Sequence, residues 1–72
     1  MARVQVLSEV SGSVWKIEAA VGTEVGADDT ILIIESMKME IPVSSPRAGR
    51  VVELKVAEGE PVKEGQVVAI VE

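Results

Sequence analysis

The chain has 72 residues, a net charge of −5, no Cys and no His, so it must fold as one small domain, residues 1–72, without disulfides or the usual ligands of zinc and haem. Its seven basic residues are scattered and Trp15 is its only aromatic residue, which argues against nucleic acid as a partner. Its strictly apolar runs are too short to cross a bilayer and its N-terminus lacks a signal-peptide pattern, so we expect a soluble, cytoplasmic protein with no membrane partner.

Short runs rich in Val and Ile, separated by Gly, Pro and Asp, predict an all-β chain. Three prolines would interrupt any helix and restrict which strands can lie inside a sheet. We expect a flattened barrel, or sandwich, of two four-stranded antiparallel sheets. In chain order its strands are predicted at roughly 3–8, 13–20, 24–26, 30–36, 39–44, 50–57, 61–63 and 67–72.

The sequence also repeats itself, because residues 2–35 lie over residues 39–72 without a gap. Coincident glycines carry most weight, since glycine marks turns. They are Gly12 with Gly49 and Gly22 with Gly59, and all four are interpreted as turn formers. Besides Met1, only Ser36, Met37 and Lys38 have no counterpart. If a rough two-fold axis relates the copies, this junction lies at one end of the domain and the chain termini meet at the other.

The strands predicted at 30–36 and 39–44 form a hairpin with Met37 and Lys38 at its tip. Neither residue is Gly or Asn, so a tight turn with positive φ would be strained, and such strain tends to mark functional sites. A lysine at a hairpin tip is ordinarily a solvated charge. Methionine, however, is normally buried, so Met37 and Met39 indicate a surface that partners contact, unless they pack back onto the barrel.

Lys38 is flanked by Glu35 and Glu40, which favour its charged form and make it a poor catalytic base. Without His there is no Ser triad, and there is no Gly-rich phosphate loop. We therefore expect Lys38 to be a substrate of another enzyme, and the chain not to be an enzyme itself. Glu35 and Glu40 are expected to be solvated strand ends, with recognition of partners through charge as the alternative. Trp15 is expected to pack in the barrel.

The stretch "ESMKMEIP" at 35–42, with "VGTEV" and "ILII" before it, "SPRAGRVVELKVAEGEPVKEGQVVAIVE" after it and the internal repeat, resembles the biotinyl domain. This domain is the biotin carboxyl carrier module of biotin-dependent carboxylases, and the resemblance covers nearly the whole chain. It implies that a biotin protein ligase attaches biotin covalently to Lys38. It also implies that CO2 travels as carboxybiotin from a biotin carboxylase to a carboxyltransferase. The fold that it implies agrees with the strand pattern.

Two departures from the family pattern qualify the resemblance. Asp28 replaces the turn glycine that the second copy has at Gly65, and Asp tolerates positive φ. No segment interrupts residues 12–25, so the protruding thumb of some acetyl-CoA carboxylase carriers is absent, as in small thumbless carriers. Met1 and the end at Glu72 suit a free-standing protein, monomeric when isolated, although an excised carboxylase domain would look similar.

Two alternatives remain open at this point. Lipoyl carrier domains of 2-oxo acid dehydrogenase-type complexes share the fold and the hairpin lysine, but they more typically show Asp-Lys-Ala at the tip, so Met37 and Met39 favour biotin. The other alternative is an unmodified barrel used only for protein contact, in which case Met-Lys-Met would be a coincidence.

Overall fold

A computed structural model describes residues 3–72, and within this range it contains eight β-strands and no helix. The strands are β1 (Val4–Leu7), β2 (Gly12–Ile17), β3 (Glu24–Val25), β4 (Thr30–Ser36), β5 (Met39–Ser44), β6 (Gly49–Leu54), β7 (Pro61–Val62) and β8 (Val67–Val71). All eight predicted strands are confirmed, and β4 and β5 have the predicted bounds. Residues 1 and 2, which the predicted domain includes, lie outside the described residues. No helix that could cross a membrane occurs in residues 3–72.

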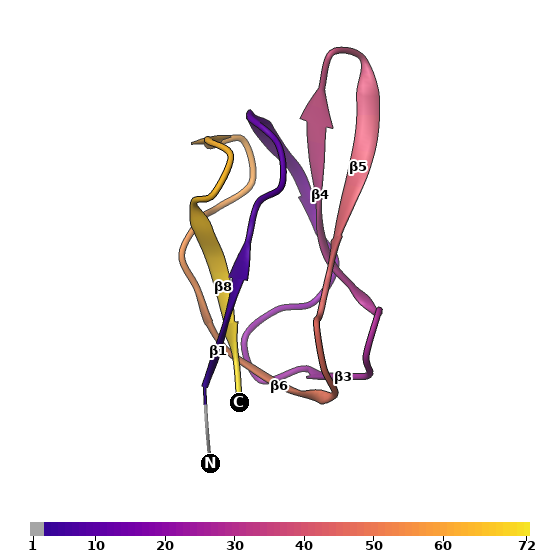
Figure 1. Ribbon diagram of the computed structural model, residues 1–72, viewed down its shortest axis with the longest axis vertical. Coiled ribbons are helices and arrows are strands. Elements are labelled where there is room, and N and C mark those ends of the chain that lie inside the picture. Colours follow the sequence, from indigo (N-terminus) through magenta and orange to yellow (C-terminus); the bar gives the residue numbers. More distant parts are fainter. Residues whose placement is uncertain (1–2) are drawn as a thin grey trace.

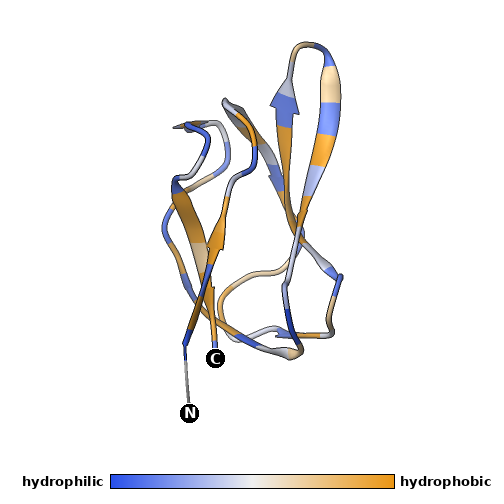
Figure 2. Cartoon of the chain, in the orientation of Figure 1, coloured by the Kyte–Doolittle hydropathy of each residue, from blue (hydrophilic) through white to orange (hydrophobic). Residues whose placement is uncertain are grey.

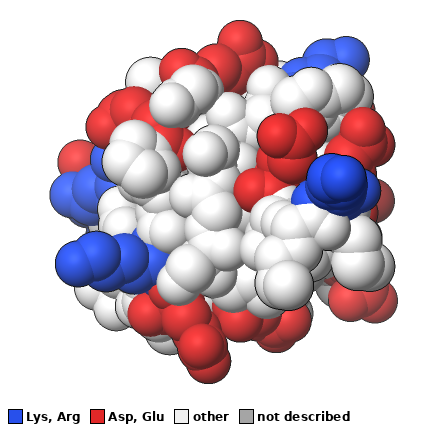
Figure 3. All heavy atoms as spheres, turned by 90° about the horizontal axis from the view of Figure 1, so that it is seen from above, with Lys and Arg blue, Asp and Glu red and all other residues white. Residues whose placement is uncertain are grey.

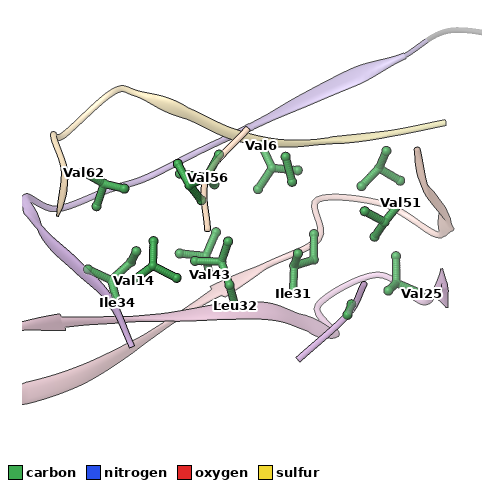
Figure 4. Close-up of a cluster of buried hydrophobic side chains, with 14 residues drawn as sticks. Val6, Val14, Val25, Ile31, Leu32, Ile34, Val43, Val51, Val56 and Val62 are labelled. Carbon is green, nitrogen blue, oxygen red and sulfur yellow. The ribbon is translucent and has the colours of Figure 1, made fainter. Parts of the chain in front are cut away.

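The strands form two four-stranded sheets in which every strand pair is antiparallel, as predicted. One sheet has the order β1-β8-β6-β3 and the other has the order β5-β4-β2-β7. The body is elongated, with extents of 36 × 17 × 17 Å. Figure 4 shows the buried side chains in one continuous strip between the two layers of strands. Valine dominates this strip, and fully burying a valine side chain contributes about 1.5–3 kcal/mol.

The two copies of the repeat are related by a pseudo-two-fold axis, which confirms the prediction. A shift of 37 residues places β1, β2, β3 and β4 on β5, β6, β7 and β8, respectively. The same shift turns the strand order of one sheet into the strand order of the other. Hydrogen bonds obey the same shift: the Gly22 amide donates to the Val51 carbonyl and the Gly59 amide donates to the Val14 carbonyl, both at 2.7 Å. Each copy places its second and fourth strands at the centre of one sheet, and its first and third strands at the edges of the other.

The hairpin of β4 and β5 projects from one end of the body, and the two chain ends lie together at the opposite end (Figure 1). Val4 pairs with Val71 there, and the Arg3 Nε forms an ion pair of 3.0 Å with the Glu72 carboxylate. The predicted separation of the junction from the termini is therefore confirmed.

Buried polar groups also follow the repeat. Ser8 and Ser45 are fully buried, and each hydroxyl donates a hydrogen bond to the carbonyl two residues later, on Val10 and Arg47. Because these bonds satisfy both hydroxyls, the two serines fix the chain where it leaves β1 and β5 without an uncompensated desolvation cost.

The predictions for Trp15, Gly12 and Gly49 were wrong. Trp15 is 48% exposed, because it follows Val14, which occupies the core, and so lies on the outer face of β2. A bulge between Val14 and Lys16 keeps Lys16 on the outer face as well. Gly12 and Gly49 begin β2 and β6 rather than forming turns. They are needed because a Cβ would collide with the carbonyl oxygens of Glu35 and Glu72. Gly22 and Gly59 do form turns, with φ of 97° and 89°.

Candidate functional site: the tip of the β4–β5 hairpin

The hairpin ends in a two-residue turn made by Met37 and Lys38. Ser36 pairs with Met39 as the last rung of the ladder, and the φ angles of Met37 and Lys38 are 52° and 65°. Positive φ at both positions is the requirement of the type I′ turn, whose twist matches that of the two strands. This conformation costs a non-glycine residue roughly 1–2 kcal/mol. The predicted strain is therefore present, and it falls on the lysine and its neighbour.

Lys38 is exposed at the tip, and it forms no ion pair within residues 3–72. Lys16 and Lys55, in contrast, pair with carboxylates two residues away, on Glu18 and Glu53. The Lys38 amine is thus held away from the body by a fixed backbone, and no neighbouring group within the described chain has to be displaced before another molecule reaches it.

The two methionines do not pack back onto the barrel. Met37 is 92% exposed and Met39 is 63% exposed. Met39 lies on the face of β5 that carries the half-buried Ile41 and the buried Val43, but it is beyond the end of the core. Figure 2 shows hydrophobic residues along the hairpin even where it extends past the rest of the chain. The tip therefore presents apolar surface on both sides of the lysine.

Glu35 and Glu40 form the rung below the turn. They lie directly opposite one another in the β4–β5 ladder, so both side chains are on one face, and both are exposed. Their exposure agrees with solvated strand ends, and it also leaves both carboxylates accessible to a partner. Viewed from the hairpin end, acidic side chains outnumber basic ones around an uncharged centre (Figure 3).

The end of β4 next to the turn is held by residues that the sequence did not identify as part of the site. The Ser36 hydroxyl donates a hydrogen bond of 2.8 Å to the carbonyl of Ser11. The next residue, Gly12, lies against the Glu35 carbonyl because it has no side chain. The segment that enters β2 therefore clamps β4 immediately before the turn. The only sequence signal was the position of Ser36 outside the repeat.

Asp28 occupies the turn that leads into β4. Its φ is 71°, and its repeat equivalent Gly65 has a φ of 85°. The Asp28 amide donates to the Ser45 carbonyl and the Gly65 amide donates to the Ser8 carbonyl, both at 2.8 Å. The turn therefore survives the replacement of glycine, as predicted.

The comparisons with known proteins agree with this geometry. The sequence model of a family described as "Biotin-requiring enzyme" matches residues 3–71. The chain is 41% identical over 59 residues to the biotin/lipoyl attachment protein of Bacillus subtilis, covering 82% of this chain and 81% of that protein. It is 40% identical over 67 residues to urea amidolyase of Saccharomyces cerevisiae, covering 93% of this chain.

The crystal structure of the Kluyveromyces lactis urea carboxylase contains a similar domain, with a TM-score of 0.95 and 36% identity over the whole of this chain. The chain spans only 4% of the urea amidolyase and 6% of the urea carboxylase, but most of the small attachment protein. Family match, identity and fold all confirm the resemblance seen in the sequence. The chain belongs to the family of biotin/lipoyl attachment domains.

Proposed function

We propose that this chain is a biotin carboxyl carrier and that Lys38 is the residue to which biotin is attached. The observation that carries the proposal is the position of Lys38. Its amine is exposed and unpaired among the described residues, at the tip of a strained two-residue turn, at the end of the body remote from Arg3 and Glu72. A solvated surface lysine needs no such turn.

The hairpin fits a covalently attached biotin. A biotin protein ligase activates the carboxyl group of biotin as an adenylate, and the Lys38 Nζ attacks the carboxyl carbon. An amide bond forms, AMP leaves, and the lysine ammonium loses two of its three protons, so that one hydrogen stays on the amide nitrogen. The chain has to supply only an accessible amine in a defined place, because the ligase provides the activation. The type I′ turn provides this place, since the ladder rung at Ser36 and Met39 fixes where the turn begins and ends.

Bound biotin supplies the ureido nitrogen that accepts a carboxyl group in a biotin carboxylase and releases it in a carboxyltransferase. The chain itself contributes the position of the attached group. Attachment to one body raises the effective concentration of the group at both sites, which requires no catalytic residues on the carrier. Met37 and Met39 provide the apolar surface that enters each partner site, and Glu35 and Glu40 contact basic groups beside it.

The partners proposed for this carrier are therefore a biotin protein ligase, a biotin carboxylase and a carboxyltransferase. The names of its relatives, among them urea amidolyase and pyruvate carboxylase, support partners of the carboxylase class. We propose that the carrier is cytoplasmic, the expectation from its sequence. We also propose that it is monomeric in isolation, because its apolar core is enclosed between the two sheets of a single chain.

Substitution of Lys38 tests the proposal directly. Purified protein is incubated with a biotin protein ligase, ATP and biotin, and the intact mass is measured. The unsubstituted chain is expected to gain one biotinyl group, and Lys38→Arg none, because a guanidinium does not form the amide. Lys63→Arg, at another exposed lysine, is the matched control and is expected to be modified normally. Biotinylation of Lys38→Arg would contradict the proposal.

A further inference from the structure

A hollow of about 270 Å³ lies beside the hairpin strand, where the edge strands β1 and β5 approach one another. Its lining includes the apolar residues Leu7, Val10, Ile41 and Pro42 and the acidic residues Glu9 and Asp28. Leu7 is 46% exposed, which is a large exposed fraction for leucine in so small a barrel. Glu9 forms no ion pair and no side-chain hydrogen bond within residues 3–72. The function proposed above uses none of these residues.

The internal repeat provides a comparison, because a second hollow is lined largely by the repeat equivalents of the residues that line the first. The shift of 37 residues places Gln5 of the second hollow on Pro42 of the first. The second hollow also has Glu64 in its wall, and it contains no residue of β5 between Met39 and Val43. Leu7 and Glu9 line both hollows, whereas Val10 and Ile41 line the first hollow and not the second.

The distance from Lys38 matches an attached biotin. Ile41 follows Lys38 by three residues on a strand that runs back from the tip, which is roughly 10 Å at the rise of a β-strand. A lysine side chain and the valeryl chain of biotin together make about ten bonds, which span roughly 12 Å when extended. An arm that folds back along β5 therefore places the bicyclic ring of biotin at Ile41 and Pro42.

We propose that this hollow is a resting site for the ring of the biotin attached to Lys38, an inference that rests on the proposed function. The apolar sulfur-containing ring packs against Leu7, Val10 and Ile41. A ureido N–H donates a hydrogen bond to the Glu9 carboxylate, which has no other partner in the described chain. The ring has an apolar body and two N–H donors, and the hollow offers aliphatic side chains together with the carboxylates of Glu9 and Asp28.

The experiment compares the same ¹⁵N-labelled chain before and after ligase treatment, with biotinylation verified by intact mass. Attachment at Lys38 alone perturbs the amide resonances of residues near the turn. A resting ring also shifts the amides of Leu7, Val10 and Ile41, while Gln5 and Glu64 of the second hollow do not change. In the biotinylated protein, Leu7→Ser and Glu9→Gln are each expected to return these shifts toward their values before biotinylation. Gln5→Ala is the matched control and is expected to leave them unchanged.

Glu9→Gln keeps the size and exposure of the side chain, so it preserves the fold even if Leu7→Ser weakens it. Shifts confined to the turn, or equal shifts around both hollows, would overturn the resting site while leaving the biotinylated carrier intact. Absence of the biotinyl mass on Lys38 would overturn the proposed function, and the resting site with it.

Discussion

Glu35 faces Glu40 across the hairpin, whereas their repeat equivalents, Glu72 and Arg3, form an ion pair of 3.0 Å at the opposite end of the body. The fold is thus compatible with opposite charges at these positions. Like charges directly opposite each other in a ladder are unfavourable, by an amount of the order of 0.2–1 kcal/mol. The divergence of the two copies has left an uncompensated acidic pair only beside the proposed attachment site.

We expect Glu40→Arg, which introduces the residue type found at the equivalent position, to raise the free energy of unfolding by less than about 1 kcal/mol. If the acidic pair attracts the ligase, the same change lowers the biotinylation rate at low ionic strength, and the difference shrinks as salt is added. Urea unfolding measures the change in stability, and ligase rates measured over a salt series test the change in biotinylation rate. Glu24→Arg makes the same change in net charge away from the hairpin, and an equal loss of rate there would rule out a local role for the pair.

Met37→Asn tests the strain in the turn. Asparagine tolerates positive φ better than methionine does, so the free energy of unfolding is expected to rise by roughly 0.5–1 kcal/mol. Met39→Asn is the control, because Met39 lies in β5 and has no positive φ, and no such gain is expected there. Urea unfolding of the two variants gives the comparison. A gain at Met39 alone would show that the turn is not strained at Met37.

Truncation of the methionines separates contact with partners from stability. Met37→Ala and Met39→Ala are expected to lower the free energy of unfolding by less than about 1 kcal/mol, because both side chains are exposed. They are also expected to slow biotinylation or carboxyl transfer. Ile34→Ala, in the same hairpin but fully buried, is expected to cost about 2–5 kcal/mol. Losses of that size at Met37 or Met39 would assign them to the core instead.

Gly12→Ala and Gly49→Ala form a matched pair at equivalent positions of the two copies. Each introduces a Cβ that collides with a backbone carbonyl, and each is expected to destabilise the chain by about 1–3 kcal/mol. Only Gly12 lies against the hairpin, through Glu35, so only Gly12→Ala should also slow biotinylation under conditions where both variants are folded. Equal ligase rates for the two would show that the clamp on β4 does not position Lys38.

The strands and the position of Lys38 at the hairpin tip could be predicted from the sequence, because the repeat shows the pattern of each strand twice. Glycines that coincide in both copies located the boundaries, and Lys38 stood out because it has no counterpart. Trp15 could not be placed, because alternation from Val14 puts it outside whereas alternation from Ile17 puts it inside, and the bulge that reconciles the two leaves no mark in the sequence. The close approach at Gly12 depends on how strands distant in sequence cross.

The hollow beside the hairpin could not be predicted from the sequence either. Leu7 and Ile41 come from different copies, and they become neighbours only because β1 and β5 are the edges of different sheets. The sequence pattern of a strand indicates which of its sides is apolar. It does not indicate which edge strands of the two sheets lie next to each other.

The exchange of edge strands between the two copies bears on how the chain acquires its structure. A single copy on its own would have two central strands with both flanking positions empty, and two detached strands without a sheet to join. Neither half is therefore expected to fold independently, and folding has to wait for contacts between distant parts of the chain, which is slow compared with local hairpin formation. A chain cleaved between Met37 and Lys38 would yield two fragments whose missing edges complement one another, so the fragments are expected to reassociate into the intact barrel.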